Sequence, residues 1–169
     1  MAELQLKQVG IINNQNKVTN WDESWGDLSW QEKTKKMNQQ HQDISELVID
    51  TDLEGILDGI DEFSHLLVLY WAHLGPIEKR SMTRVHPMGR QDFPLTGIFA
   101  TQSPVRPNPI LATVVKLVAH QENILKVTGL DAMDGSPILD IKPYTGSLIV
   151  NETIKVPDWI RKIQQAFRK

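Results

Sequence analysis

The sequence predicts a small, mostly antiparallel β-barrel with short peripheral helices. Apolar segments of strand length outnumber segments with helical periodicity. The connections between these segments are short and polar, which suits antiparallel neighbours. The chain also lacks a dinucleotide-binding glycine fingerprint and the regular alternation of strands and helices that a doubly wound fold requires. A doubly wound nucleotide-binding fold is therefore not expected.

The chain has 169 residues, of which 40% are hydrophobic and 23% are charged, enough for one domain with a real core. We assign residues 1–147 to a barrel domain that includes a helical segment at about 21–41. Residues 148–169 form a C-terminal helical tail and not a separate domain.

The sequence contains no cysteine, which excludes a disulfide framework, a thiolate metal site and a cysteine nucleophile. It shows neither a signal-peptide pattern nor an apolar stretch that could span a membrane. We therefore expect a cytoplasmic protein with no membrane partner.

The first third of the chain is expected to contain two strands and a helix. The segment Leu4–Ile12 alternates loosely and ends at two asparagines, which is typical of a strand. Ser29 and Glu32 form a capping box that starts a helix reaching about Gln40. A short apolar strand follows at Ile44–Ile49.

Tryptophans gather around the predicted helix, and their role has two interpretations. The simpler one is a short helix pinned to the body by a tryptophan, and the alternative is an aromatic cluster that binds a ligand. The tryptophans concerned are Trp21, Trp25 and Trp30.

Further along, apolar residues with helical spacing occur in an acidic run, at Leu53, Ile56, Leu57 and Ile60. The segment Ser64–Ala72 is expected to be the central, buried strand, because it has no breaker and is rich in β-compatible residues. The remaining predictions are a long functional loop at Gly75–Thr96, a hairpin of Ile110–Val118 and Ile124–Leu130, a turn at Asp131–Gly135 and a last strand at Ile138–Ile141.

The tail is expected to form an amphipathic helix with Pro157 at its first position. Its apolar stripe consists of Trp159, Ile163 and Phe167. That stripe most simply docks on the barrel or on a second subunit, and contact of a basic helix with RNA is the alternative.

The segment Gly97–Ile110, GIFATQSPVRPNPI, is the most informative stretch of the chain. Its three prolines restrict the backbone around Ser103, Arg106 and Asn108 before anything binds. A stiff loop with polar side chains can be a plain connector, but it is also a common way to present a site. We favour the second interpretation.

Charge is segregated along the chain although the net charge is only −3. Residues 46–62 contain seven acids and no base, whereas residues 79–116 contain six bases and one acid, Asp92. The second segment could provide a local basic surface for a nucleic acid.

The Gly97–Ile110 loop, together with the segments Ile60–His73, Arg84–Pro87 and Gly129–Tyr144, resembles the signature of the TsaA-like family. This family includes the TrmO-type tRNA methyltransferases, and the resemblance covers roughly residues 6–147. It implies a compact barrel, a homodimer and S-adenosylmethionine as cofactor. The implied reaction is N6-methylation of threonylcarbamoyl-adenosine next to the anticodon of tRNA.

The resemblance also implies site residues. Contacts with S-adenosylmethionine are expected at His73, Leu74, Gln102, Ala112, Ala132, Met133, Asp134 and Gly135, and Gln102 stands where the family usually has arginine. Asp131 could supply a second carboxylate on the same turn. Catalytic roles are expected for Asp134, Arg106 and Asn108, and RNA contacts for Arg84, Arg90, Arg106, Lys142 and Tyr144. No metal ligand is expected.

Two points stay open in the sequence. The general base is not assigned, and its candidates are Asp134, Asp140 and His73. The competing functions are a non-catalytic S-adenosylmethionine-binding or regulatory module and a methyltransferase that acts on a small molecule.

Overall fold

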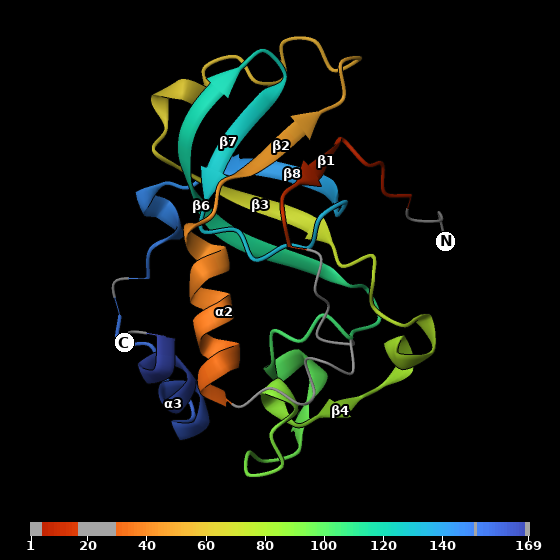
Figure 1. The fold of residues 1–169 in the computed structure, drawn as a ribbon, viewed down its shortest axis with the longest axis vertical. Coiled ribbons are helices and arrows are strands. Elements are labelled where there is room, and N and C mark those ends of the chain that lie inside the picture. The colour runs from red at the N-terminus through yellow and green to blue at the C-terminus, as the bar shows by residue number, and fades with distance from the viewer. Residues whose placement is uncertain (1–4, 17–29, 151, 168–169) are drawn as a thin grey trace.

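A computed structural model describes residues 5–16, 30–150 and 152–167. Within these ranges, six antiparallel strands close a barrel, flanked by two α-helices and a two-stranded ribbon (Figure 1). The predicted fold class is confirmed. The barrel order is β1 (Gly10–Asn13), β2 (Ser45–Ile49), β7 (Ile124–Thr128), β6 (Ile110–Gln121), β3 (His65–Trp71) and β8 (Pro137–Pro143), which pairs again with β1. The ribbon consists of β4 (Arg84–Val85) and β5 (Thr96–Gly97), and the helices are α2 (Trp30–Gln42) and α3 (Asp158–Phe167).

Strand β3 is the central strand that the sequence predicted. It pairs with β6 along one side and with β8 along the other. Its residues alternate between inside and outside, so Leu66, Val68 and Tyr70 are buried in the core. They pack with inward-facing side chains of the other five strands, including Ile12, Leu47, Val115, Leu125 and Ile138.

The opening strand is shorter than expected. Residues 5–8 are exposed, and strand pairing with β2 covers only Gly10–Asn13. The prediction of a strand over Leu4–Ile12 was therefore wrong at its start. The reason is that β2 ends at Ile49, opposite Gly10, so the residues before Val9 have no partner strand against which to bury an apolar face.

The helical spacing in the acidic run was misleading. Residues 51–59 form consecutive turns, followed by a 3₁₀ turn at Ile60–Glu62. Gly55 and Gly59 have φ angles of 76° and 79°, in the left-handed region, and these interrupt a right-handed helix. Three of the four apolar residues still turn inward, because Leu53, Leu57 and Ile60 pack against the core. Ile56 is 55% exposed.

The predicted helix after residue 29 is confirmed as α2, which ends two residues later than expected. Its end is tied to the barrel through His41, whose carbonyl oxygen accepts a hydrogen bond from Gly129 N at 2.9 Å. The imidazole Nδ1 of His41 also lies 3.1 Å from Gly129 O. Ser29, Trp21, Trp25 and the side chain of Trp30 lie outside the described residues.

Helix α3 starts one residue later than predicted. Ile160 N donates to Pro157 O, so Pro157 occupies the capping position and not the first helical position. The helix contacts α2 (Figure 1). The ring centroid of Trp159 lies 6.3 Å from that of Phe93. The division into a barrel domain and a tail after residue 147 stays a prediction.

The long loop at Gly75–Thr96 is partly structured. It contains a 3₁₀ turn at Ile77–Ser81, and its strand β4 pairs with β5 just before the Gly97–Ile110 loop. Among the described residues, no helix is long and apolar enough to cross a membrane.

Candidate functional site

Barrel closure brings His73 next to the turn that contains Asp134 and Gly135. His73 follows the end of β3, and the turn leads into β8, the neighbour of β3 in the barrel. Ser136 Oγ and His73 Nδ1 lie 3.3 Å apart. A Cβ atom added to Gly135 would lie 3.6 Å from His73 Nε2, so the turn packs directly against the imidazole. Two segments about 60 residues apart thus form one site.

The N-terminal segment holds this turn in place. Asp134 Oδ1 accepts a hydrogen bond from Asn14 N at 2.9 Å, and Gly135 N donates to Ile12 O at 2.8 Å. The carbonyl oxygen of Ala132 accepts hydrogen bonds from Asn14 Nδ2 and Asn16 Nδ2, at 3.0 and 3.1 Å. From the sequence, Asn13 and Asn14 were expected only to end a strand, and no role was predicted for Asn16. Their signal was a cluster of amide side chains beside that strand end, which can bridge to another segment.

These hydrogen bonds leave fewer polar groups of the turn available to a ligand than the sequence predicted. One carboxylate oxygen of Asp134 fixes the backbone of Asn14, and the amide groups of Asp134 and Gly135 donate to backbone carbonyls. Several groups that the sequence offered to a ligand are therefore engaged in holding the turn. Ala132 itself is 1% exposed, and its carbonyl oxygen already accepts two hydrogen bonds.

A second carboxylate, that of Asp131, lies at the mouth of the barrel. Its Oδ1 accepts hydrogen bonds from Tyr70 Oη at 2.8 Å and from Thr113 Oγ1 at 2.6 Å. Burial, reinforced by the charge of Asp131, raises the pKa of Tyr70, so its hydroxyl stays protonated and remains a donor. Asp131 itself is exposed. The two hydroxyls fix an acceptor group that points to solvent beside the turn, and sequence reasoning did not identify Tyr70 or Thr113.

The Gly97–Ile110 loop is held by its own arginine. Arg106 Nε donates to Ser103 O at 2.9 Å, and Nη2 donates to Thr101 O at 2.7 Å and to Ile98 O at 3.4 Å. The loop ends beside the site, because Pro109 O accepts a hydrogen bond from Ala72 N, next to His73. Arg106 thus braces the loop, whereas the sequence analysis expected its donors to face a ligand.

The other expected cofactor contacts differ in their exposure to solvent. Leu74 is 45% exposed, Gln102 is exposed and Met133 is half-buried. Ala112 is exposed on β6 and pairs with Leu69.

The residues expected to contact RNA fall into two separate groups. Arg84 and Arg90 belong to the loop that carries the β4–β5 ribbon. Arg106 lies in the Gly97–Ile110 loop, and its hydrogen bond to Ile98 O ties it to the residue after β5. Lys142 pairs with Leu67, and Tyr144 N donates to His65 O, so both lie near the opposite end of β3 from His73. Eight residues of extended chain separate His65 from His73, which is about 25 Å. The structure does not bring all five residues together.

Two of these cations already have partners. Arg90 forms a two-pronged hydrogen bond with Asp92 and lies over the ring of Phe93, 4.5 Å from its centroid. Lys142 forms an ion pair with Asp140, one of the three candidate bases. Arg84 is exposed on β4.

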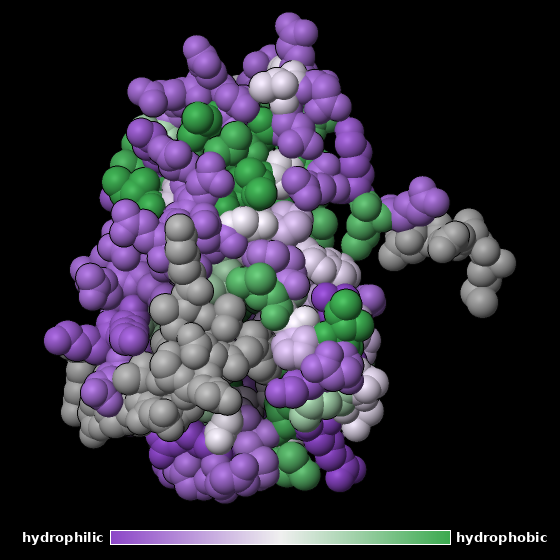
Figure 2. Space-filling view, turned by 45° about the vertical axis from the view of Figure 1, so that its right-hand side comes forward, coloured by the Kyte–Doolittle hydropathy of each residue, from purple (hydrophilic) through white to green (hydrophobic). Residues whose placement is uncertain are grey.

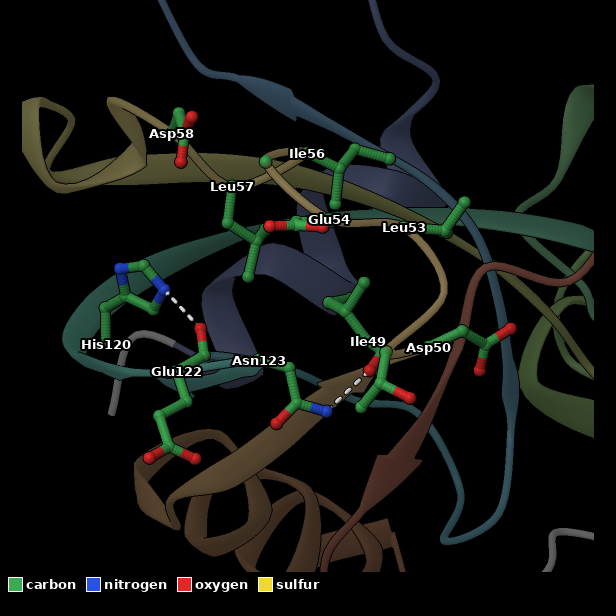
Figure 3. A pocket seen from close by; sticks show the side chains of 12 residues that line it. Ile49, Asp50, Leu53, Glu54, Ile56, Leu57, Asp58, His120, Glu122 and Asn123 are labelled. Atoms are coloured by element: carbon green, nitrogen blue, oxygen red, sulfur yellow. Dashed lines mark hydrogen bonds between the residues drawn. The ribbon is translucent and has the colours of Figure 1, made fainter.

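A pocket at the other end of β6 contains none of these residues. It lies between the turns at 50–58 and the β6–β7 hairpin (Figure 3). Asn123 Nδ2 donates to Ile49 O at 2.7 Å and ties the hairpin to β2. The carboxylates around it, those of Asp50, Glu54, Asp58 and Glu122, disfavour an anionic ligand (Figure 3). No cluster of three potential metal ligands occurs among the described residues.

His73 and His120 should affect the pH dependence of stability in opposite directions. Burial lowers the pKa of His73, and the charge of Asp134 opposes this only in part. The unfolded chain therefore binds a proton on His73 more tightly than the folded chain does. The contribution of neutral His73 to the free energy of unfolding is present above about pH 6.5 and is lost as pH falls through the lowered pKa. The hydrogen bond to Asp61 raises the pKa of His120. The contribution of protonated His120 to the free energy of unfolding is therefore present below about pH 6.5 and is lost as pH rises through the raised pKa.

Urea unfolding of wild type, His73→Asn and His120→Gln at several pH values from about 5 to 8.5 tests this expectation. The destabilisation caused by His73→Asn should shrink toward acid pH, and that caused by His120→Gln should shrink toward alkaline pH. If the destabilisation caused by one of these substitutions does not change with pH, the direction of the pKa shift given for that histidine is wrong.

The sequence of this chain is similar to a known family and to several known proteins. Residues 29–148 match the family described as the tRNA-methyltransferase O N-terminal domain. A probable S-adenosyl-L-methionine-binding protein of Methanothermobacter thermautotrophicus is 37% identical over 142 residues, which are 84% of this chain and 90% of the relative. The tRNA (adenine(37)-N6)-methyltransferase of Mus musculus is 40% identical over 92 residues, which are 54% of this chain and 21% of the mouse protein.

The fold has solved counterparts. The crystal structure of TrmO from Pseudomonas aeruginosa superimposes with a TM-score of 0.62 and 21% sequence identity. The match covers 90% of this chain and 61% of the solved chain, so the chain spans about three fifths of that TrmO. At this level of identity, the likeness concerns the fold.

Proposed function

The chain belongs to the tRNA-methyltransferase O N-terminal domain family, and from this membership we propose that it is an S-adenosylmethionine-dependent methyltransferase that acts on tRNA. The observation that carries the proposal is the contact of His73 with the turn at Asp134 and Gly135. Both segments are expected to contact the cofactor, and the closed barrel joins them beside the Gly97–Ile110 loop. The relatives named for S-adenosylmethionine binding and for tRNA methylation support the same function.

The polar groups of the site suit this cofactor. S-adenosylmethionine offers hydrogen-bond donors on its ribose and its amino group, and Asp131 is a fixed acceptor held by two hydroxyls. The exposed Leu74 and the half-buried Met133 provide apolar surface next to the polar groups. When bound, the cofactor supplies an electrophilic methyl group.

The chain's own residues would position the acceptor and manage one proton. We propose methylation at N6 of threonylcarbamoyl-adenosine next to the anticodon, an acceptor nitrogen that must lose a proton. Among the three candidate bases, His73 has the best support, because burial lowers its pKa and keeps the ring neutral near pH 7. Asp134 is engaged with Asn14, and Asp140 is paired with Lys142. In this role, the neutral imidazole takes the proton that the acceptor nitrogen releases.

Two measurements test the function. Calorimetry with S-adenosylmethionine and the purified chain should give a saturable signal. Incubation with cofactor and tRNA from a strain that lacks this activity should then increase the mass of its threonylcarbamoyl-adenosine by one methyl group. Cofactor binding without any methylated nucleoside would instead favour a regulatory binding module, and methylation of small molecules alone would favour the third alternative.

We further propose a cytoplasmic homodimer. The outer face of β6 exposes Val114 and Val118, which are 40% and 50% exposed, and a second copy would cover such a face. The cysteine-free sequence fits a reducing compartment. Sedimentation at micromolar concentration should show a dimer, and a monomer that still binds cofactor would contradict this part of the proposal.

A further inference from the structure

Phe99 has the most exposed large hydrophobic side chain among the described residues. It is 83% exposed and lies near the start of the Gly97–Ile110 loop. Leu95 and Ile77 of the preceding loop are also exposed, at 55% and 74%. The site described above makes no use of Phe99. An aromatic ring this open to water is typical of a surface that contacts a partner.

The backbone under this ring is rigid. Phe99 lies in a 3₁₀ turn, Ile98–Ala100, whose first residue is 5% exposed and anchors the turn in the interior. Ile98 N donates to Thr83 O at 2.9 Å. Ile98 O accepts hydrogen bonds from Thr101 N, Thr101 Oγ1 and Arg106 Nη2, at 3.1, 2.8 and 3.4 Å. Because the turn is already ordered, binding to the ring costs little conformational entropy.

An exposed positive charge lies beside the turn that carries the ring. The β4–β5 ribbon pairs the exposed Arg84 with Gly97, two residues before Phe99. The segment 79–116 is rich in bases, but Arg90 is bonded to Asp92 and Lys116 pairs with His65 on β3, so Arg84 is the cation that the ribbon places next to this turn. A partner for this surface should carry negative charge together with flat, stackable groups.

The exposed apolar side chains of this region are few: Ile77, Leu95 and Phe99. On the face of the molecule drawn in Figure 2, hydrophobic surface in the lower half, outside the grey atoms, occurs in small patches between hydrophilic ones. Obligate protein interfaces are larger and more continuously apolar. Aromatic side chains within a basic surface are instead the usual combination for unpaired nucleobases and their phosphates.

We propose that Phe99 stacks on an unpaired base of single-stranded RNA, with Arg84 neutralising an adjacent phosphate. The inference rests on the proposed function and adds the part of the tRNA that this surface recognises, an unstacked loop nucleotide. It adds an apolar aromatic side chain to the polar and charged residues that are predicted to contact RNA.

The experiment uses the full chain and a synthetic anticodon stem-loop that contains 2-aminopurine in the loop. Stacking on Phe99 should quench the fluorescence of the probe and should not require cofactor. Phe99→Ala and Phe99→Leu should weaken binding roughly 5- to 100-fold and abolish the quenching, because leucine is apolar but has no aromatic face. Phe99→Trp should preserve both signals. Cofactor affinity and melting temperature should not change in any variant, since the side chain is exposed.

Salt dependence separates the two contacts. Arg84→Ala should give a shallower dependence of affinity on salt concentration, whereas Phe99→Ala should leave the slope unchanged. RNA affinity equal to wild type in Phe99→Ala would overturn the inference. Weakened self-association of Phe99→Ala in sedimentation, with RNA binding intact, would overturn it and assign the ring to a protein interface. Wild-type protein that binds cofactor but no RNA would overturn the RNA substrate and the inference together.

Discussion

Replacement of Arg106 by alanine is expected to lower the stability of the protein and its affinity for RNA together. The change removes the guanidinium donors of three backbone carbonyls in the Gly97–Ile110 loop. Ile98 O keeps its two hydrogen bonds from Thr101, but the part-buried Ser103 O and Thr101 O lose their guanidinium donor, which should cost about 2–3 kcal/mol. For a chain of this size, that corresponds to a melting temperature lower by roughly 5–10 °C. RNA binding should weaken because Ile98, which carries the turn of Phe99, loses one of its anchors.

Two matched variants make this expectation specific. Arg84 is exposed, so Arg84→Ala should leave the melting temperature nearly unchanged while weakening RNA binding. Arg106→Lys keeps the charge but cannot reproduce the forked contact, so it should recover little stability. If Arg106→Ala melts like wild type, the bracing role is wrong. If Arg106→Lys restores RNA affinity without restoring stability, the charge of Arg106 contacts phosphate directly.

Gly10→Ala is expected to cause the largest loss of stability among the substitutions considered. An alanine Cβ at this position would lie 2.4 Å from Val48 O and 3.0 Å from Ile49 Cα, and both are backbone atoms of the paired strand. Strand β1 would have to move away from β2, with a cost of about 2–4 kcal/mol. Cofactor affinity should also fall, because β1 leads into the asparagine segment that holds the turn at Asp134. Urea unfolding and calorimetry measure the two effects.

Gly97→Ala is the matched control. A Cβ there would have no heavy atom within 4 Å, and the φ angle of −57° is accessible to alanine. Its stability should therefore differ from wild type by less than about 0.5 kcal/mol, or rise slightly through reduced freedom of the unfolded chain. If Gly10→Ala and Gly97→Ala have the same free energy of unfolding, the close approach of β1 and β2 does not limit stability.

The acidic run at residues 46–62 shows why the spacing of apolar residues alone can mislead. Leu53, Leu57 and Ile60 have the spacing of a helix, and they do pack against the core. Apolar spacing reports which side chains turn inward, but the backbone conformation depends on the left-handed glycines at 55 and 59. The strand at Ser64–Ala72 was predicted well because a continuous apolar run without breakers has few alternatives in a domain of this size.

By itself, the sequence determined the barrel class, the central strand, the hairpin and the turn before the last strand, because these depend on local patterns of apolar and turn-forming residues. It also indicated the family through three motifs beyond the Gly97–Ile110 loop. The tertiary structure alone decided which polar groups are engaged: Arg106 with its own loop, Asp134 with Asn14, and Asp131 with Tyr70 and Thr113. The partners of Asp134 and Asp131 come from segments distant in sequence, and the direction of a flexible side chain such as Arg106 depends on the fold around it. Only the closed barrel therefore shows which groups brace the site and which remain open to a ligand.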